Sequence, residues 1–140
     1  MSEANRDKFH ILNSSAMFLL IDLSEKDKIH LELFDEKTSC KAEYSGRNRE
    51  LLTSIDAFFN KQKFDKKGLK GIMAVVGKGS FTNTRISAVV SNVFGYALKI
   101  PVMAIAKEQV GQAQKLIPKL KKMPVGQYIS AKYSGEPNIG

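Results

Sequence analysis

The sequence has few residues that cross-link proteins or bind metals, and it has no apolar run long enough to span a membrane. It holds no tryptophan, one cysteine, four prolines and two histidines in 140 residues. The single cysteine, Cys40, excludes an internal disulfide and is typical of a reducing compartment, so we expect a cytoplasmic protein. The apolar run Met17–Ile21 is far too short to cross a bilayer, and no secretory pattern precedes it. We therefore expect no association with a membrane.

Residues that commonly carry catalysis are also sparse. His10 and His30 do not have the spacing of a helical metal pair, and no third ligand accompanies them, so no metal site is predicted. Ser80 and Thr82 have no histidine base near them in the sequence, which leaves a distant base as the alternative. Cys40 lies in an expected strand and is interpreted as a small buried apolar residue. The residues give no positive case for hydrolysis.

Acidic residues are outnumbered in this chain. Fourteen Asp and Glu face twenty-two Lys and Arg, which gives a formal net charge of +8. The lysines form two clusters, Lys61–Lys70 and Lys115–Lys122. The favoured interpretation is a solvated lysine surface, because neither cluster has the interleaved aromatic residues of a single-strand binding platform. Contact with tRNA as part of an assembly is the alternative.

The most informative stretch is Gly71–Ala106. Its apolar run Ile72–Val76 predicts a strand buried on both faces, and the glycines that follow predict a tight turn. A helix capped by Asn83 or Thr84 should come next, followed by a second parallel strand at Val102–Ala106. The apolar stripe of that helix is predicted to be Ile86, Val89, Val90, Val93, Phe94, Ala97 and Leu98.

The remaining segments complete one α/β domain over residues 1–140. Its core should span residues 16–122, with an extended tail over 123–140. We predict a mixed five-stranded sheet, three strands antiparallel and two parallel, with helices on both faces. The other predicted elements are strands Ala16–Leu23, Lys28–Phe34 and Thr38–Tyr44, a helix Arg47–Lys63, and a helix Lys107–Ile117 limited by Pro118.

One side of the central helix carries a row of small residues. Such a row leaves a flat groove into which another helix can settle at short distance. The apolar stripe of the Arg47–Lys63 helix is too broad for a narrow contact line, so part of it is expected to reach the same partner. An ordinary solvated back face is the alternative. The predicted partner interface consists of Leu51, Ile55, Phe58, Ser87, Ala88, Ser91 and Gly95.

The turn before the central helix carries a motif. The stretch Gly77-Lys-Gly-Ser-Phe-Thr-Asn-Thr-Arg85 resembles the Gly-Pro-Gly-Ser-Phe-Thr-Gly-Leu-Arg motif of the TsaB family, also called YeaZ. Lys78 replaces the proline, and Asn83-Thr84 replaces Gly-Leu. A phosphate-binding P-loop is rejected, because Gly71 is one residue too far from Gly77 and Gly79 follows Lys78. The motif loop is Gly77, Lys78, Gly79, Ser80, Phe81, Thr82 and Arg85.

The resemblance covers residues 16 to 106 and implies a fold and a function. The fold would be the first ribonuclease H-like lobe of the actin, hexokinase and Hsp70 superfamily. The function would be that of a non-catalytic subunit in the synthesis of threonylcarbamoyladenosine on tRNA. It would dimerise with a TsaD-like subunit that holds the ATP and the metal, with a TsaE-like ATPase as a further member. The chain itself would bind no cofactor, would meet tRNA only indirectly, and would form a homodimer in isolation.

Asp22 is the candidate for a vestigial phosphate or metal site. The superfamily places a carboxylate at the end of its first strand, where its oxygens can coordinate Mg²⁺. A turn-capping role is favoured, since the ATP site of these proteins lies between two lobes. The competing functions are a nucleotide-binding or hydrolytic remnant that uses Asp22 and the glycine loop, and a basic RNA-binding module.

Overall fold

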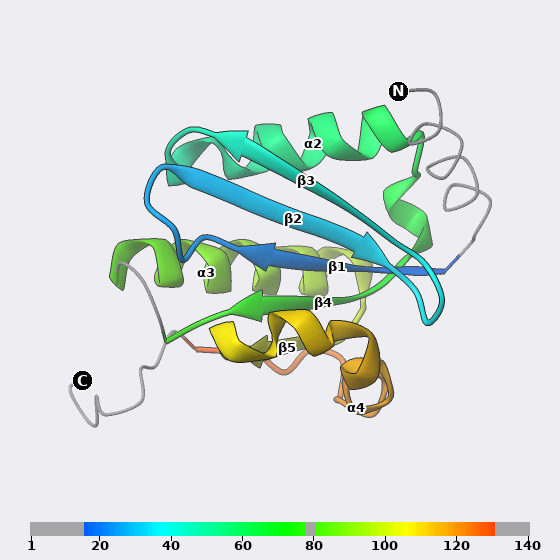
Figure 1. Cartoon of the computed structure of the whole chain (residues 1–140). Coiled ribbons are helices and arrows are strands. Elements are labelled where there is room, and N and C mark those ends of the chain that lie inside the picture. The colour runs from blue at the N-terminus through cyan, green and yellow to red at the C-terminus, as the bar shows by residue number, and fades with distance from the viewer. Residues whose placement is uncertain (1–15, 78–80, 131–140) are drawn as a thin grey trace.

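A computed structural model describes residues 16–77 and 81–130; the side chains of residues 48, 81 and 82 are outside that description. Within it the chain forms one five-stranded sheet with the order β3-β2-β1-β4-β5 (Figure 1). This confirms the predicted mixed sheet. The strands are β1 (Met17–Asp22), β2 (Lys28–Phe34), β3 (Ser39–Ser45), β4 (Leu69–Val75) and β5 (Val102–Ile105).

The pairing follows the alternation in the sequence. β1, β2 and β3 form an antiparallel meander, in which Leu19 pairs with Leu33. β4 runs parallel to β1, with Leu19 opposite Ile72, and β5 runs parallel to β4. The central strand β1 is buried along its whole length, because both of its neighbours and both of its faces are covered.

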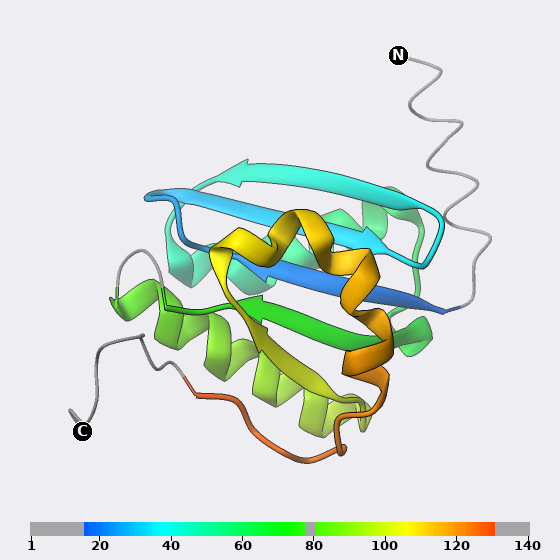
Figure 2. The ribbon, with the colours of Figure 1, turned by 60° about the horizontal axis from the view of Figure 1, so that its bottom comes forward.

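Helices cover both faces of the sheet (Figures 1 and 2). Two α-helices pack on one face, and a 3-10 helix that leads into a short α-helix packs on the other. No helix in the described ranges is both long and apolar enough to cross a membrane. The helices are η1 (Asn48–Glu50), α2 (Leu51–Gln62), η2 (Lys66–Gly68), α3 (Phe81–Leu98), η3 (Lys107–Leu116) and α4 (Ile117–Lys121).

Each face of the sheet has its own apolar core. On one face, Leu19, Ile21 and Leu31 of the sheet form a core with Ile55 and Phe58 of α2. On the other face, the rings of Phe18 and Phe34 lie 6.0 Å apart under η3 and α4. These alternating positions are what the period of two in a strand predicts.

The helices differ from the sequence-based expectation in three details. α3 begins at Phe81, so Asn83 and Thr84 lie inside the helix instead of capping it. Residues 107–116 form a 3-10 helix, which is kinked at Gln112. Pro118 stands in the first turn of α4, where its missing N–H has no helical partner to lose, and does not end a helix.

The tail and part of the motif loop fall partly outside the described residues. Residues 124–130 contain neither helix nor strand, while the rest of the predicted extended tail, 131–140, lies beyond the described part. Lys78, Gly79 and Ser80 are likewise outside it. Gly77, which is described, has a φ of +88°, a left-handed conformation that suits glycine in the predicted tight turn.

Candidate functional site

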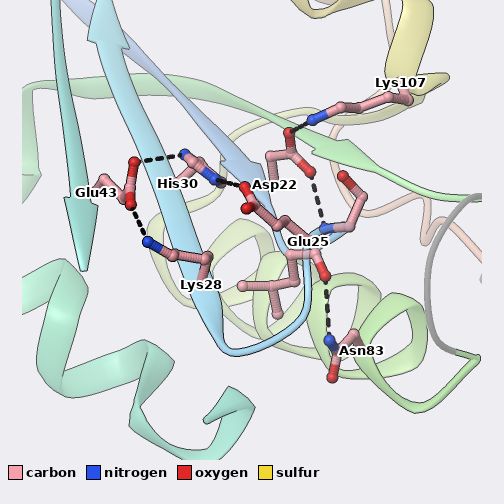
Figure 3. Close-up of polar contacts among 9 residues, drawn as sticks. Asp22, Glu25, Lys28, His30, Glu43, Asn83 and Lys107 are labelled. Atoms are coloured by element: carbon pink, nitrogen blue, oxygen red, sulfur yellow. Dashed lines mark hydrogen bonds and ion pairs between the residues drawn. The ribbon is translucent and has the colours of Figure 1, made fainter. Parts of the chain in front are cut away.

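Asp22 is the last residue of β1, and its side chain is only 3% exposed. Its Oδ2 accepts a hydrogen bond from the Lys107 Nζ at 2.6 Å, and its Oδ1 accepts one from the Ser24 backbone N–H at 2.9 Å (Figure 3). Burial by itself raises the pKa of Asp22, but the bonds from Lys107 and Ser24 outweigh it and lower that pKa below its ordinary value. Asp22 is therefore a charged, fully bonded carboxylate at neutral pH.

This arrangement does not fit a divalent cation at Asp22. The Lys107 ammonium already lies where a metal would approach the carboxylate, and the second oxygen is used by the turn at Ser24. Across the described residues, no group of three His, Cys, Asp or Glu side chains could hold a metal ion. The geometry instead matches the turn-capping role that the sequence favoured for Asp22.

A pocket of about 170 Å³ opens beside Asp22, on the half of the sheet that η3 leaves uncovered. Glu32, at its floor, is 8% exposed, and this burial raises the pKa of Glu32 despite the nearby Lys41 charge and a bond from Ser39. The pocket therefore mixes carboxylates with cationic side chains. Its lining residues are Leu20, Asp22, His30, Leu31, Glu32, Lys41, Ala42, Lys107 and Val110.

Ion pairs neutralise the charges that surround this pocket (Figure 3). The Lys28 ammonium lies 2.6 Å from Glu43, and this bond lowers the pKa of the Glu43 carboxyl. The His30 Nε2 lies 2.8 Å from a Glu25 oxygen. These contacts place Glu25, Lys28, His30 and Glu43 in one network beside the pocket.

The first turn of α3 is tied to the loop after β1. The Asn83 side-chain amide donates a hydrogen bond to the Leu23 carbonyl at 3.1 Å, which fixes the start of the helix against the end of the strand (Figure 3). Sequence reasoning missed this contact because the two residues are sixty positions apart. Arg85, the last residue of the motif, is exposed on the same helix.

The small-residue row of α3 does not form an open groove, so that expectation is wrong. Ser87 and Ser91 are 0% exposed, and Ala88 is 4% exposed. A Cβ added at Gly95 would lie 2.5 Å from Cγ2 of Val102 in β5. The row faces the sheet, and small side chains let the helix backbone approach the strands closely.

The predicted contribution of α2 to a partner interface is corrected in the same way. Leu51 is 1% exposed, and Ile55 and Phe58 are 0% exposed, because all three pack in the core between α2 and the sheet. The breadth of the apolar stripe reflects the width of that core. A partner cannot reach these side chains, or the α3 row, without opening the monomer.

The outward side of α3 carries the apolar residues instead. Val89, Val93 and Tyr96 are 57%, 59% and 71% exposed, although the sequence placed the two valines in the core stripe. Asn92 lies in the same stripe and makes two 3.0 Å hydrogen bonds to the backbone of Ile129, which holds the C-terminal segment beside the helix. The spacing of residues 89, 92, 93 and 96 was the available signal for this face. We call Val89, Val93 and Tyr96 the outer stripe.

The architecture defines a class of protein. An antiparallel meander that continues into two parallel strands, with order β3-β2-β1-β4-β5 and helices on both faces, is the ribonuclease H-like fold that the resemblance implied.

Comparison with known proteins finds a similar fold in YeaZ. No family model and no curated protein matches the chain. YeaZ from Pseudomonas aeruginosa matches with a TM-score of 0.59 and 22% identity, over 65% of this chain and 45% of that one. An "uncharacterized protein with similarity to peptidase YEAZ from Pseudomonas aeruginosa" gives 0.60 and 20%, over 74% and 49%. The chain has the fold of a YeaZ lobe and spans about half the length of these structures.

The Asp22–Lys107 pair should be measurable in stability. Lys107→Met is expected to lower the free energy of unfolding at pH 7 by about 1–3 kcal/mol, because it leaves a buried carboxylate without its cation. The pKa of Asp22 is lowered on folding, so its contribution is present above the ordinary value of 3.8 and is lost as the pH falls through the lower folded value. Urea unfolding across this range measures the effect, with Lys107→Arg as control. Equal stability of Lys107→Met and wild type at pH 7 would contradict the pair's role.

The burial of Ser91 gives a second prediction. Its hydroxyl is fully buried with no hydrogen-bond partner among the described residues. Ser91→Ala should therefore be at least as stable as the wild type, whereas Ser91→Leu should lose about 1–3 kcal/mol by overpacking. Val93→Ser, on the exposed side, should change stability by less than about 0.5 kcal/mol. Thermal unfolding of the three variants decides; a tolerated Ser91→Leu would mean that the row is open after all.

Proposed function

We propose that the chain is a non-catalytic TsaB-like subunit that associates with a TsaD-like protein in the complex that makes threonylcarbamoyladenosine on tRNA. ATP and metal would be held by that partner, and a TsaE-like ATPase would complete the assembly. The observation that carries the proposal is the joint occurrence of a YeaZ fold and the Gly77–Arg85 motif at the strand-to-helix turn of that fold.

The outer stripe of α3 is the proposed docking surface. Three large apolar side chains on successive turns are more than half exposed on an otherwise well-buried helix. A helix that packs on them would bury apolar area at the usual helix-to-helix distance, which is the kind of contact the resemblance implies. The side chains first assigned to the interface are excluded by their burial, so the contact moves to the opposite side of α3.

The absence of catalysis in this proposal is supported by Asp22. In an ATP-binding lobe this carboxylate would be open to a metal, whereas here Lys107 occupies it. A hydrolytic remnant is therefore the weaker alternative.

Introducing negative charge into the outer stripe tests the docking surface. Val93→Glu with Tyr96→Glu should weaken binding to the organism's own TsaD-like subunit at least tenfold, because two charges would be desolvated in the contact. Isothermal titration with the purified subunit measures the affinity. Gel filtration of the chain alone reports self-association through the same stripe.

The control is Gly111→Glu on η3, a single added charge over the other face of the sheet. A side chain added there meets nothing within 4 Å, so the variant should fold and bind as the wild type does. Undiminished binding by the Val93→Glu, Tyr96→Glu variant would refute the docking surface. If the wild type fails to bind the TsaD-like subunit, the assigned function itself falls.

Nucleotide binding gives an independent test of the catalytic alternative. Titration of the chain with ATP and Mg²⁺ should release no heat above dilution at millimolar nucleotide, because Lys107 blocks the metal side of Asp22. Saturable binding that is lost in Asp22→Asn would favour the nucleotide-binding remnant over the scaffold.

A further inference from the structure

The two lysine clusters of the sequence meet at one end of the sheet. α2 and α3 each lead into a parallel strand, β4 and β5, so their C-terminal ends lie where those strands start, and the end of α4 lies at the same end of the sheet (Figures 1 and 2). Five lysines between Lys61 and Lys70 and four between Lys115 and Lys122 lie at this end of the sheet, together with Lys37 and Lys99. All eleven side chains are exposed. We call them the lysine end.

Side-chain contacts confirm that these segments are neighbours. Leu120 of α4 packs against β4, since a Cβ added at Gly71 would lie 2.8 Å from its Cδ2. The Lys121 ammonium lies 3.3 Å from Glu36 in the turn between β2 and β3. The Gln114 amide donates to the Asp35 carbonyl in that same turn at 2.9 Å. One continuous surface therefore joins the start of β4, the β2–β3 turn and α4.

The lysine end carries a large positive excess. Among the described residues of this end, the acidic side chains are Asp35, Glu36 and Asp65. Asp35 accepts from the Lys37 and Thr38 backbone N–H groups, and Asp65 accepts from that of Lys67, so both serve their own turns. Eleven cations against three carboxylates match the net charge of the whole chain, +8.

Helix termini do not account for this excess. The C-terminal end of a helix favours a cation because it carries roughly half of a negative elementary charge. Three such ends would balance fewer than two lysines. At the opposite end of the sheet, by contrast, ion pairs such as Asp22–Lys107 and Lys28–Glu43 join cations to carboxylates of the chain. The excess of cations at the lysine end suits an anionic ligand.

We propose that the lysine end binds the phosphate backbone of a nucleic acid without reading its sequence. Lysine ammonium groups act as point charges on flexible stems, which suits repeated phosphates and not a single fixed anion. Binding would be driven by release of the counterions condensed on the backbone. This inference goes beyond the scaffold function and does not depend on it, because the outer stripe lies on a different surface.

A nucleic acid fits this surface better than an acidic protein or a lipid bilayer. Protein interfaces are depleted in lysine and use arginine and aromatic residues instead, whereas this end is built from lysine alone among its cations. Proteins that bind membranes through basic surfaces also insert apolar side chains. Here Phe64, Leu69 and Ile100, which stand between the lysines in the sequence, are at least 91% buried.

Charge reversal at matched positions tests the proposal. The variant Lys66→Glu, Lys67→Glu, Lys119→Glu changes the lysine end, and Lys26→Glu, Arg47→Glu, Arg49→Glu makes the same charge change at exposed positions of the opposite end. Fluorescence anisotropy with a labelled RNA hairpin, and with a DNA duplex of matched length, gives the affinity at several salt concentrations. Lys→Gln at the first three positions replaces the reversal if that variant does not fold by circular dichroism.

We expect the wild type to bind with a logarithmic affinity that falls linearly with the logarithm of salt concentration. The lysine-end variant should bind at least tenfold more weakly, with a salt slope smaller by about 2–3, since each lost phosphate contact removes roughly 0.7–0.9. The opposite-end variant should bind within about threefold of the wild type. Preference for the hairpin or for the duplex identifies the nucleic acid. Equal losses in both variants, no binding by the wild type, or tighter binding to phosphatidylserine vesicles would overturn the proposal.

Discussion

The close approach of α3 to the sheet is the constraint on which the rest of the structure depends. Ser87, Ser91 and Gly95 place almost no bulk between the helix backbone and the strands, and Val102 fills the space that a side chain at Gly95 would need. A helix seated this closely cannot also turn Val89 and Val93 towards the sheet. Those two valines are therefore directed outward, and the outer stripe is a consequence of tight packing on the other side of the same helix.

This geometry explains which parts of the fold the sequence predicts. β2 was predicted residue for residue, because a period of two reports directly on which side of a strand is buried. The orientation of α3 was predicted only in part: Ile86, Val90, Phe94 and Leu98 pack against the core, whereas Val89 and Val93 face outward. Counting large apolar residues assumes that burial follows size. In α3, burial also follows the distance between helix and sheet, which is a property of the packed pair of elements.

The candidate site, too, was predicted from the sequence only in part. Asp22 was identified from its place at the end of an apolar strand, which is local information. Its partner Lys107 is eighty-five residues away and comes close only because β5 pairs parallel to β4 and delivers the start of η3 beside β1. The meaning of Asp22 changes with that partner: an isolated strand-end carboxylate attracts a cation, whereas one bonded to an ammonium stabilises the fold. The two lysine clusters likewise come together because of the topology, since α2, α3 and α4 all end where the parallel strands start.

The outer stripe and the lysine end differ in chemistry and in position. The outer stripe is apolar and follows the length of α3, while the lysine end is cationic and lies across the starts of the parallel strands. An apolar contact gains little from long-range attraction but holds its geometry, whereas clustered charges attract a polyanion over about a Debye length and tolerate many arrangements. Because the stripe runs along α3 and the lysines gather where the helices end, a helix docked on the stripe would leave most of the lysines open to solvent. The two proposed contacts, one with a protein and one with a nucleic acid, therefore need not compete for the same atoms.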